Sequence, residues 1–327
     1  MTVQTWLRRL SPDPYVLAIM FMVALATIAP VSGPTASALG LGTKFAIGGL
    51  FFLHGAKLSR EAVIAGLSHW RLHLTVLAST FLLFPILGLA ARRLPTSIMS
   101  DALSAGVLFL CCLPSTVQSS IAFTSMARGN VAASVCAASA SNLLGILVTP
   151  LLGAVLLGSS GHGNALDAIA AIGTQLFLPF AGGQVARPWI RAWLERQKRL
   201  VSYIDRGSIL LVVYGAFSTA VTDGLWTKVS GPEVLRLAVV CGILLAGMIA
   251  ATLFIARSMG FPMADQIAIV FCGSKKSLAS GVPMASILFP APMVGMLVLP
   301  LMIFHQMQLM ACAVLAQHWA ARPIDES

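Results

Sequence analysis

The sequence predicts an all-α polytopic membrane protein, and three observations support this fold class. Hydrophobic residues make up 57% of the 327 residues and charged residues only 10%, whereas an ordinary soluble domain carries about 25% charged residues. The apolar runs are long enough to cross a bilayer core about 30 Å thick, which needs roughly 20 residues per helix. Lys and Arg also gather on alternate loops, as they do on the cytoplasmic side of membrane proteins.

We expect ten transmembrane helices, because polar or Pro/Gly-rich segments divide the chain into ten apolar stretches. Their approximate ranges are 13–30, 39–57, 71–92, 101–127, 130–158, 166–187, 203–222, 233–257, 263–289 and 292–318. The run 15–29 reads as the first of these helices rather than as a signal peptide, because another span follows at once. Most Lys and Arg fall on the side that holds both termini, so both are predicted to be cytoplasmic, in a bacterial inner membrane.

The formal net charge of +10 is therefore explained by membrane topology, and we expect no nucleic-acid partner. All six cysteines lie in apolar runs without a CxxC pair, so we interpret them as buried hydrophobic residues. No HExxH or GxSxG motif and no paired intramembrane carboxylates are present, which argues against an enzyme. We expect no cofactor, apart from Na⁺ or H⁺ as a coupling ion.

An internal repeat is suggested by the division of the ten spans into five before residue 159 and five after it, with the hydrophilic stretch 187–206 near the middle of the chain. Sliding the second half over the first places Cys112 on Cys272 and Ser120 on Ser280. Because five is odd, the second half would begin on the opposite side of the membrane. The halves 1–158 and 159–327 would then be inverted repeats, a common plan among transporters.

The fourth span contains a polar interruption that begins at Pro114. A proline removes one amide donor and clashes with the preceding helical turn, so we expect the helix to break here. Backbone groups freed inside a bilayer must be buried in protein or face a water-filled cavity. The hydroxyl and amide side chains that follow are candidate partners for that backbone, or ligands for a small ion or substrate: Ser115, Thr116, Gln118, Ser119 and Ser120.

The ninth span is interrupted at the equivalent place by Ser274, Lys275, Lys276 and Ser277. A charge at the centre of a membrane helix costs about 2.5–3.5 kcal/mol on insertion scales, so such lysines usually have a function. The alternative is that the span is misplaced and the lysines reach the interface with their long side chains. No acidic residue lies deep in any predicted span, so the lysines lack an obvious carboxylate partner.

Weaker candidates lie in other spans. Ser134, Ser141 and Asn142 share one face of the fifth span and could face the break of the fourth. Alternatively, these small polar residues only permit close helix packing. His54 in the second span could bind a substrate, although a lone histidine in an apolar helix is more often a hydrogen-bonded structural group.

The polar segment 114–120, Arg128 to Ala132, Thr149 with Pro150, and the segment 273–278 resemble the bile acid:sodium symporter family, in particular its sodium/bile acid cotransporter 7-like branch. The resemblance implies ten helices in two inverted repeats, with broken fourth and ninth helices that cross. It further implies a panel domain of spans 1, 2, 6 and 7 (13–57 and 166–222) and a core domain of spans 3–5 and 8–10 (71–158 and 233–318). Substrate would bind between the two domains.

In sodium-dependent members, the residues that match Ser119, Ser120 and Ser134 hold one ion. A second ion is held by an acidic residue of the ninth span with a polar residue of the third, here near Thr80. This chain instead has Lys275 and Lys276 at that break, and a lysine there would oppose Na⁺. Our hypothesis is that the Lys276 ammonium takes the place of a coupling cation, either binding an anionic substrate directly or cycling a proton.

These observations predict a secondary transporter that moves a small organic anion across the lipid bilayer by alternating access. A cation/proton exchanger on the same crossed-helix plan is an alternative, disfavoured because such exchangers usually need a deep carboxylate. A non-transporting membrane regulator of ion homeostasis is a third. The sequence leaves the substrate, the coupling ion and the oligomeric state open.

Overall fold

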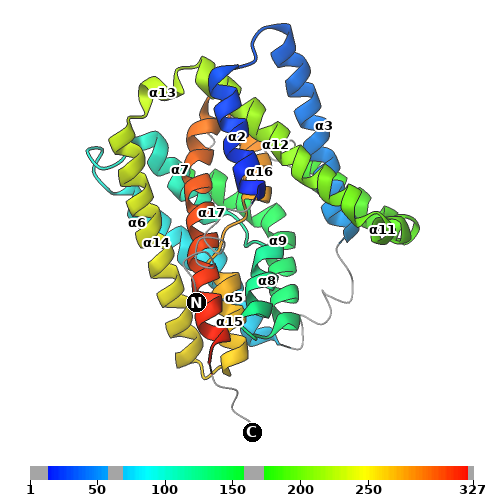
Figure 1. The fold of residues 1–327 in the computed structure, drawn as a ribbon, viewed down its shortest axis with the longest axis vertical. Helices are drawn as coiled ribbons and strands as arrows, with labels where there is room; N and C mark the ends of the chain where they lie inside the picture. The colour runs from blue at the N-terminus through cyan, green and yellow to red at the C-terminus, as the bar shows by residue number, and fades with distance from the viewer. Residues whose placement is uncertain (1–13, 58–68, 158–172, 323–327) are drawn as a thin grey trace, which may run out of the picture.

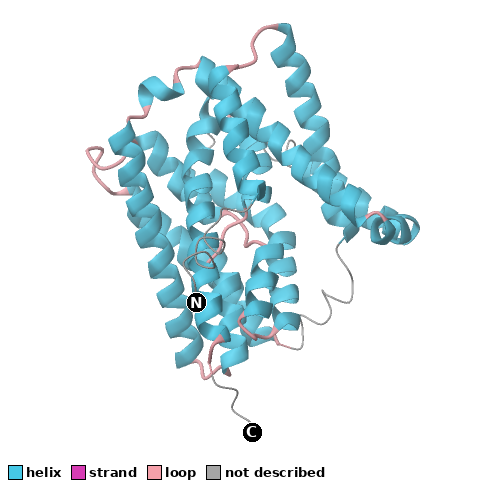
Figure 2. Cartoon of the chain, in the orientation of Figure 1, coloured by secondary structure: helices cyan, strands magenta, loops and turns pink. Residues whose placement is uncertain are grey.

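The computed structural model describes residues 14–57, 69–157 and 173–322, and within these ranges the chain consists of helices joined by short loops, with no strand (Figure 2). The helices are α2 (Pro14–Ile28), α3 (Pro34–Lys57), α5 (Trp70–Ala78), α6 (Phe84–Arg92), α7 (Asp101–Cys112), α8 (Gln118–Met126), α9 (Val131–Leu157), α11 (Leu178–Arg196), α12 (Lys198–Thr222), α13 (Leu225–Lys228), α14 (Gly231–Ser258), α15 (Met263–Gly273), α16 (Leu278–Leu288) and α17 (Ala291–Ala320). Two short π-helical segments, η1 (Ser79–Leu83) and η2 (Gly173–Phe177), precede α6 and α11.

Six helices in the described part of the chain are long and apolar enough to cross a membrane. They are α3, the continuous run from α5 through η1 to α6, α9, α12, α14 and α17. The all-helical fold is therefore confirmed for the described residues, with six candidate membrane spans, and the predicted count of ten stays a prediction. The predicted fourth and ninth spans are each divided into two half-helices, α7 with α8 and α15 with α16. The relation of the two halves as inverted repeats stays a prediction.

The hydrophilic stretch 187–206, predicted to lie between two spans, differs from the prediction because most of it is helical. Helix α11 continues to Arg196 and α12 begins at Lys198, with only Gln197 between them. Arg, Leu, Glu and Lys all favour helix, and Arg191 donates to Glu195 one turn later at 2.7 Å. Polarity alone therefore predicted the end of the apolar segment but not the end of the helix.

Helix α12 packs against α2, α3 and α11, and α3 and α11 lie together at one side of the molecule (Figure 1). Their backbones approach closely at two glycines. A Cβ atom added to Gly55 would collide with the carbonyl of Phe180, and one added to Gly183 would collide with the carbonyl of Phe52. Small residues permit this kind of backbone contact between membrane helices.

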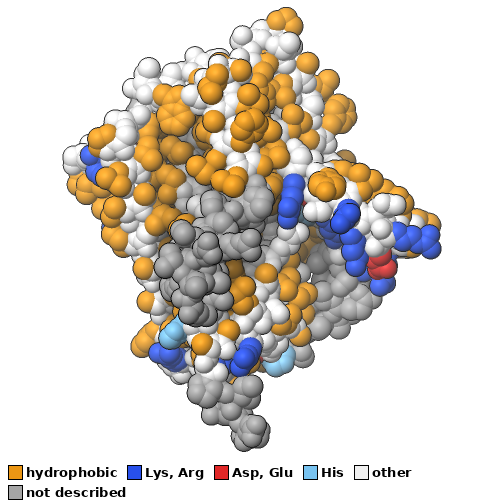
Figure 3. Space-filling model, viewed as in Figure 1, with side chains coloured by type: hydrophobic (Ala, Val, Ile, Leu, Met, Phe, Trp, Pro, Cys, Tyr) orange, Lys and Arg blue, Asp and Glu red, His pale blue; other side chains and the backbone are white. Residues whose placement is uncertain are grey.

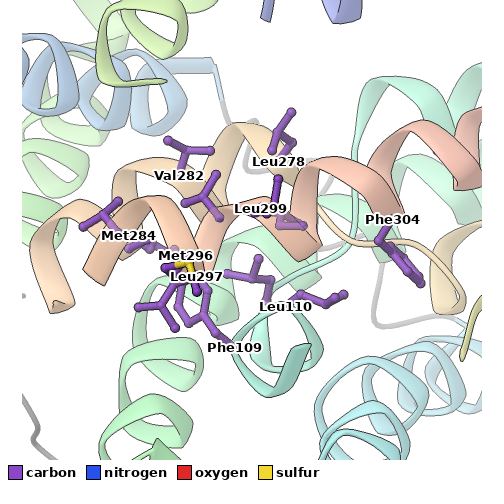
Figure 4. Packing of buried hydrophobic residues seen from close by; sticks show 14 of the residues in the cluster. Phe109, Leu110, Leu278, Val282, Met284, Met296, Leu297, Leu299 and Phe304 are labelled. Atoms are coloured by element: carbon purple, nitrogen blue, oxygen red, sulfur yellow. The ribbon is translucent and has the colours of Figure 1, made fainter. Parts of the chain in front are cut away.

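Helix α17 occupies the centre of the bundle and contacts α7, α8, α12, α14 and α16; it is the orange-to-red helix in Figure 1. Its buried face includes Leu297 and Phe304, which lie in one hydrophobic cluster with Phe109 of α7 and Val282 of α16 (Figure 4). This packing supports both pairs of half-helices from one side, so the two breaks are held at a fixed separation.

The face drawn in Figure 3 is largely apolar, and one group of Lys and Arg side chains lies over the junction of α11 and α12. Trp189 and Tyr203, on either side of that junction, are 76% and 72% exposed. Aromatic side chains next to basic ones are typical of the boundary between a bilayer and water. The junction of α11 and α12 therefore has the character of a membrane–water interface.

Candidate functional site

The first break in the bundle separates α7 from α8 and begins at Leu113, whose backbone is extended (φ −75°, ψ 157°). The residue before a proline is driven out of the helical region by the proline ring, and Pro114 cannot donate to the helix. The break predicted at Pro114 is confirmed.

The second break separates α15 from α16 and contains the predicted polar segment. Ser274 to Ser277 lie outside the helices, and the Ser277 hydroxyl accepts from the amide of Ser280, capping α16. No proline lies in this break, since Pro283 lies inside α16.

The two breaks lie against each other and satisfy each other's backbone. The Ser277 amide donates to the Pro114 carbonyl at 2.9 Å, and the Ser115 hydroxyl donates to the Cys272 carbonyl at 2.5 Å. The Ser120 hydroxyl, one turn into α8, donates to the Phe271 carbonyl at 2.8 Å. Such partners are what buried, non-helical backbone requires at bilayer depth.

Lys276 is fully buried between these breaks. Its Nζ atom donates to the carbonyls of Thr80 (2.8 Å), Cys111 (2.7 Å) and Leu113 (2.7 Å), and it lies 4.1 Å from the centre of the Phe84 ring. Three carbonyl oxygens match the three donors of an ammonium group. The main chain of Lys276 is also held, because Gln308 of α17 accepts from its amide and donates to its carbonyl, each at 2.9 Å.

Lys275 is also fully buried but is directed to the other side of the break. Its Nζ atom donates to the Ser119 hydroxyl at 3.1 Å and lies 4.6 Å from the Phe123 ring centre and 5.8 Å from that of Phe271. Aromatic faces attract a cation with particular strength where water is excluded. The side chains of the two lysines therefore point in different directions and contact different groups, as expected for adjacent residues near a helix end.

The hydroxyl residues of the predicted sodium site fall into two groups. Ser119 donates to Thr116 at 2.8 Å, and Thr116 lies 3.0 Å from Ser120. Ser134 instead meets Thr124 at 3.2 Å and the Cys272 thiol at 3.2 Å. Because the Lys275 ammonium already bonds Ser119, a sodium ion sharing that oxygen would lie beside a positive charge. These residues therefore do not fit Na⁺ as they are arranged.

The remaining predicted residues are divided between structural and cavity positions. Asn142 donates to the Ser115 carbonyl at 2.7 Å and accepts from Ser280 at 3.0 Å, while Ser141 accepts from the Ser115 amide. The Ser274 hydroxyl bonds only the Val270 carbonyl of its own helix. Thr80 supplies its carbonyl to Lys276, whereas its hydroxyl is buried and finds no partner among the described residues.

A cavity of about 630 Å³ lies between the two breaks and the helices α3, α11 and α12. The predicted residues that line it are His54, Thr116, Gln118, Ser119, Asn142 and Ser277. The others, which support the breaks from behind, are Lys275, Lys276, Ser115, Ser120, Ser134, Ser141, Thr80 and Ser274. The cavity therefore meets the first turns of α8 and α16, where amide groups carry the positive end of a helix dipole.

Residues 13–321 match the model of the SBF-like CPA transporter family. The chain belongs to this family. It is 58% identical over 318 residues (97% of this chain and 96% of the relative) to "Uncharacterized protein PA2026" of Pseudomonas aeruginosa, and 53% identical over 307 residues (94% and 92%) to "Putative symporter YfeH" of Escherichia coli strain K12. It is also 30% identical over 316 residues (94% and 92%) to sodium/bile acid cotransporter 7-A of Xenopus laevis.

Membership in this transporter family confirms the resemblance found in the sequence and agrees with the expectation that the chain is not an enzyme. In this SBF-like chain the cavity also contains charged residues that the sequence reasoning missed. Lys57 of α3 forms an ion pair with Asp205 of α12, and Arg206 lies beside them with its guanidinium 5.3 Å from the Tyr15 ring centre.

These residues were overlooked because they lie at the ends of predicted spans, and Arg206 also belongs to a basic stretch that topology already explained. One signal could have found Asp205: it is the only acidic residue between Glu195 and the end of the seventh predicted span at 222. A single carboxylate at the start of an apolar run usually needs a partner. Because α12 begins at Lys198, Asp205 lies within the helix and in the cavity wall, where it is only 9% exposed.

Proposed function

We propose that this SBF-like protein is a secondary active transporter that moves a small organic anion by alternating access. One observation carries the proposal: the first turns of two broken helices, α8 and α16, line a cavity that Lys57 of α3 and Arg206 of α12 also line. Helix N-termini attract anions through their free amides and their dipoles. Together these positive groups would surround a carboxylate or sulfonate.

The size and lining of the cavity suggest an amphipathic substrate. Its volume of about 630 Å³ lies within the range that is typical of binding sites for small organic molecules. Phe51, Phe180, Ile209 and Met284 supply apolar walls, while polar groups concentrate at the breaks. A substrate with an apolar body and one anionic group fits this distribution.

For movement, we propose the predicted division into a panel (13–57 and 166–222), with α2, α3, α11 and α12, and a core (71–158 and 233–318), with the remaining helices except α13; residues 13, 158 and 166–172 of these ranges lie outside the described residues. The panel helices pack on one another, and the cavity is lined from both groups. Rocking of one group against the other would expose the cavity to either side in turn. The predicted cytoplasmic termini and inner-membrane location would place the basic α11–α12 junction on the cytoplasmic side.

For coupling, we propose that Na⁺ is not used at the breaks. The Lys276 ammonium bonds three backbone carbonyls that would otherwise suit a metal cation, and the Lys275 ammonium bonds Ser119. The Lys276 ammonium would then take the place of a coupling cation as a permanent internal charge, which is not the proton cycling that the sequence hypothesis offered. Its complete burial also argues against the alternative role in that hypothesis, direct binding of an anionic substrate.

A cation/proton exchanger remains the second candidate, and Asp205 favours it. The sequence disfavours exchange because it shows no carboxylate deep in a predicted span, whereas in the structure Asp205 is buried in the cavity wall. Its pairing with Lys57 points instead to a site whose net charge is positive once Arg206 is included.

The test is uptake into liposomes that contain the purified full chain. We expect accumulation of taurocholate or naphthalene-2-sulfonate, chosen because a sulfonate on an apolar body matches the cavity, under an inward H⁺ gradient and not under an inward Na⁺ gradient. Proton movement driven by external K⁺ or Na⁺ in the absence of any anion would favour the exchanger. If no organic anion in a panel of carboxylates and sulfonates is taken up under either gradient, the proposal is wrong.

A further inference from the structure

The ion pair between Lys57 and Asp205 joins α3 to α12 on a wall that two spaces share. Besides the main cavity, a smaller hollow of about 400 Å³ lies against the same two residues, together with Gln118 and Ser202. The Lys57 side chain is 36% exposed and the Asp205 side chain 13%. Lys57 can therefore change partner without leaving solvent, whereas Asp205 is held in the wall.

Asp205 uses only one of its carboxylate oxygens. Oδ2 accepts from Lys57, while Oδ1 is buried and has no hydrogen-bond partner among the described residues. A buried carboxylate oxygen without a partner is costly, because the charge has been taken out of water without compensation. This oxygen is a place where a proton can be added without breaking a hydrogen bond.

Other ionisable groups near the pair come from several helices. In the main cavity they are His54 of α3, Arg206 of α12, Tyr15 of α2 and His305 of α17. In the hollow they are Arg187, Arg191 and Glu195 of α11 and Lys198 of α12. Helices α8, α9 and α16 contribute no charged side chain to either space. Asp205 is therefore the only carboxylate among the described residues that line the main cavity.

We propose that a proton bound by Asp205 releases Lys57 to bind the substrate anion, so that one proton and one anion bind together. This inference rests on the proposed function and names its coupling ion. The proton goes to a carboxylate oxygen of Asp205, which becomes neutral, and the anion takes the place of that carboxylate beside the Lys57 ammonium. For a monovalent anion the combined step is electroneutral.

The physical reason for coupling is that neither event is favourable alone. Protonation of Asp205 without an anion leaves a partly buried ammonium uncompensated, which is more costly than the paired state. Binding of an anion without a proton brings it close to the Asp205 charge, where like charges repel in a medium of low dielectric. Each event removes the penalty of the other, which is a reciprocal linkage.

The test uses the purified full chain and naphthalene-2-sulfonate or taurocholate, whose sulfonates stay ionised throughout the pH range studied. Binding is followed by the ligand concentration that gives half-maximal thermal stabilisation. If one proton binds with each anion, affinity should rise as pH falls, by up to about tenfold per pH unit. Bound protons should be detectable as pH rise in weakly buffered solution.

Asp205→Asn mimics the protonated form, so it should bind the sulfonates at high pH with little pH dependence and without proton uptake. Asp223→Asn is the matched control, because Asp223 lies just after the last turn of the same helix, exposed and away from the cavity. It should behave as the native chain. If Asp205→Asn does not fold, the neutral pair Lys57→Gln with Asp205→Asn keeps similar side-chain size and should bind weakly at every pH.

Two results would overturn the inference in different ways. Sulfonate binding that is independent of pH in the native chain, or equally pH-dependent in Asp205→Asn, would show that Asp205 does not bind the coupled proton. The proposal of anion transport would be unaffected. If no sulfonate or carboxylate stabilises either the native chain or Asp205→Asn, both the proposed anion site and this inference are wrong.

Discussion

The side-chain nitrogen of Lys276, in the break between α15 and α16, lies 2.7 Å from the carbonyl oxygen of Leu113, in the break between α7 and α8. A single ammonium therefore connects the two interrupted helices through their backbones. Carbonyl groups at such a break have no helical partners, and the long lysine side chain supplies donors from within the chain. The bond makes the second break part of the support for the first.

Removal of this ammonium should lower the unfolding free energy and make the stability of the protein depend on sodium. Lys276→Ala leaves three buried carbonyls without a donor, and we expect a loss of about 3 kcal/mol in unfolding free energy. Sodium could then reach the vacated carbonyls, so NaCl should stabilise the variant more than KCl does, whereas the native chain should not distinguish them. Thermal unfolding in each salt measures both effects.

The control for that experiment is Lys44→Ala, which removes an exposed lysine of α3 that lines neither the cavity nor the smaller hollow. It should unfold as the native chain does in both salts. Unchanged stability and unchanged ion dependence in Lys276→Ala would contradict the role we assign to this ammonium.

Lys275 should influence anion binding through Ser119, which lines the cavity. Lys275→Gln removes a positive charge behind that serine, and we expect affinity for naphthalene-2-sulfonate to fall about threefold to tenfold. Lys275→Arg keeps the charge and should retain most of the affinity. The measurement is the half-maximal concentration for stabilisation, with Lys44→Gln, an exposed lysine of α3 outside the cavity, as the control.

An effect of equal size in Lys44→Gln would show that only the total charge matters. No change in Lys275→Gln would show that the buried charge does not reach the substrate.

The contact between α3 and α11 can be tested with two adjacent glycines. Gly183→Ala forces a Cβ into the Phe52 carbonyl, whereas a Cβ at Gly182 meets only a Phe52 ring carbon at 3.9 Å. We expect Gly183→Ala to destabilise the protein by about 1–3 kcal/mol and Gly182→Ala to be close to neutral. The unfolding temperatures of the two purified variants, compared side by side, report the difference; equal temperatures would argue against this close approach.

Two buried serines in the two breaks give another matched comparison. The Ser115 hydroxyl bonds the Cys272 carbonyl across the crossing, while the Ser274 hydroxyl bonds a carbonyl of its own helix. Ser115→Ala should cost about 1 kcal/mol or more, because it leaves a buried carbonyl unpaired between helices. Ser274→Ala should cost less, since the Val270 carbonyl also accepts from the Ser274 amide at 3.1 Å.

Chemical denaturation of the two serine variants gives the two free energies of unfolding. A larger loss in Ser274→Ala than in Ser115→Ala would mean that the crossing does not depend on this bond.

The fold class and the break at Pro114 could be predicted because both depend on local chemistry. Apolar runs need a length that is set by the bilayer, and a proline removes a donor wherever it lies in a helix. The junction of α11 and α12 could not be predicted from polarity, because helical propensity and the Arg191–Glu195 bond continue the helix beyond the apolar segment.

The sequence by itself determined that Lys275 and Lys276 lie inside a span and must have partners there. Only the tertiary structure decided what those partners are: three carbonyls from two distant segments for Lys276, and a serine with two aromatic rings for Lys275. It also decided that Asp205 and Lys57, 148 positions apart, share the cavity wall. The physical reason is that backbone carbonyls look alike in every sequence, and pairing between helices depends on how those helices pack.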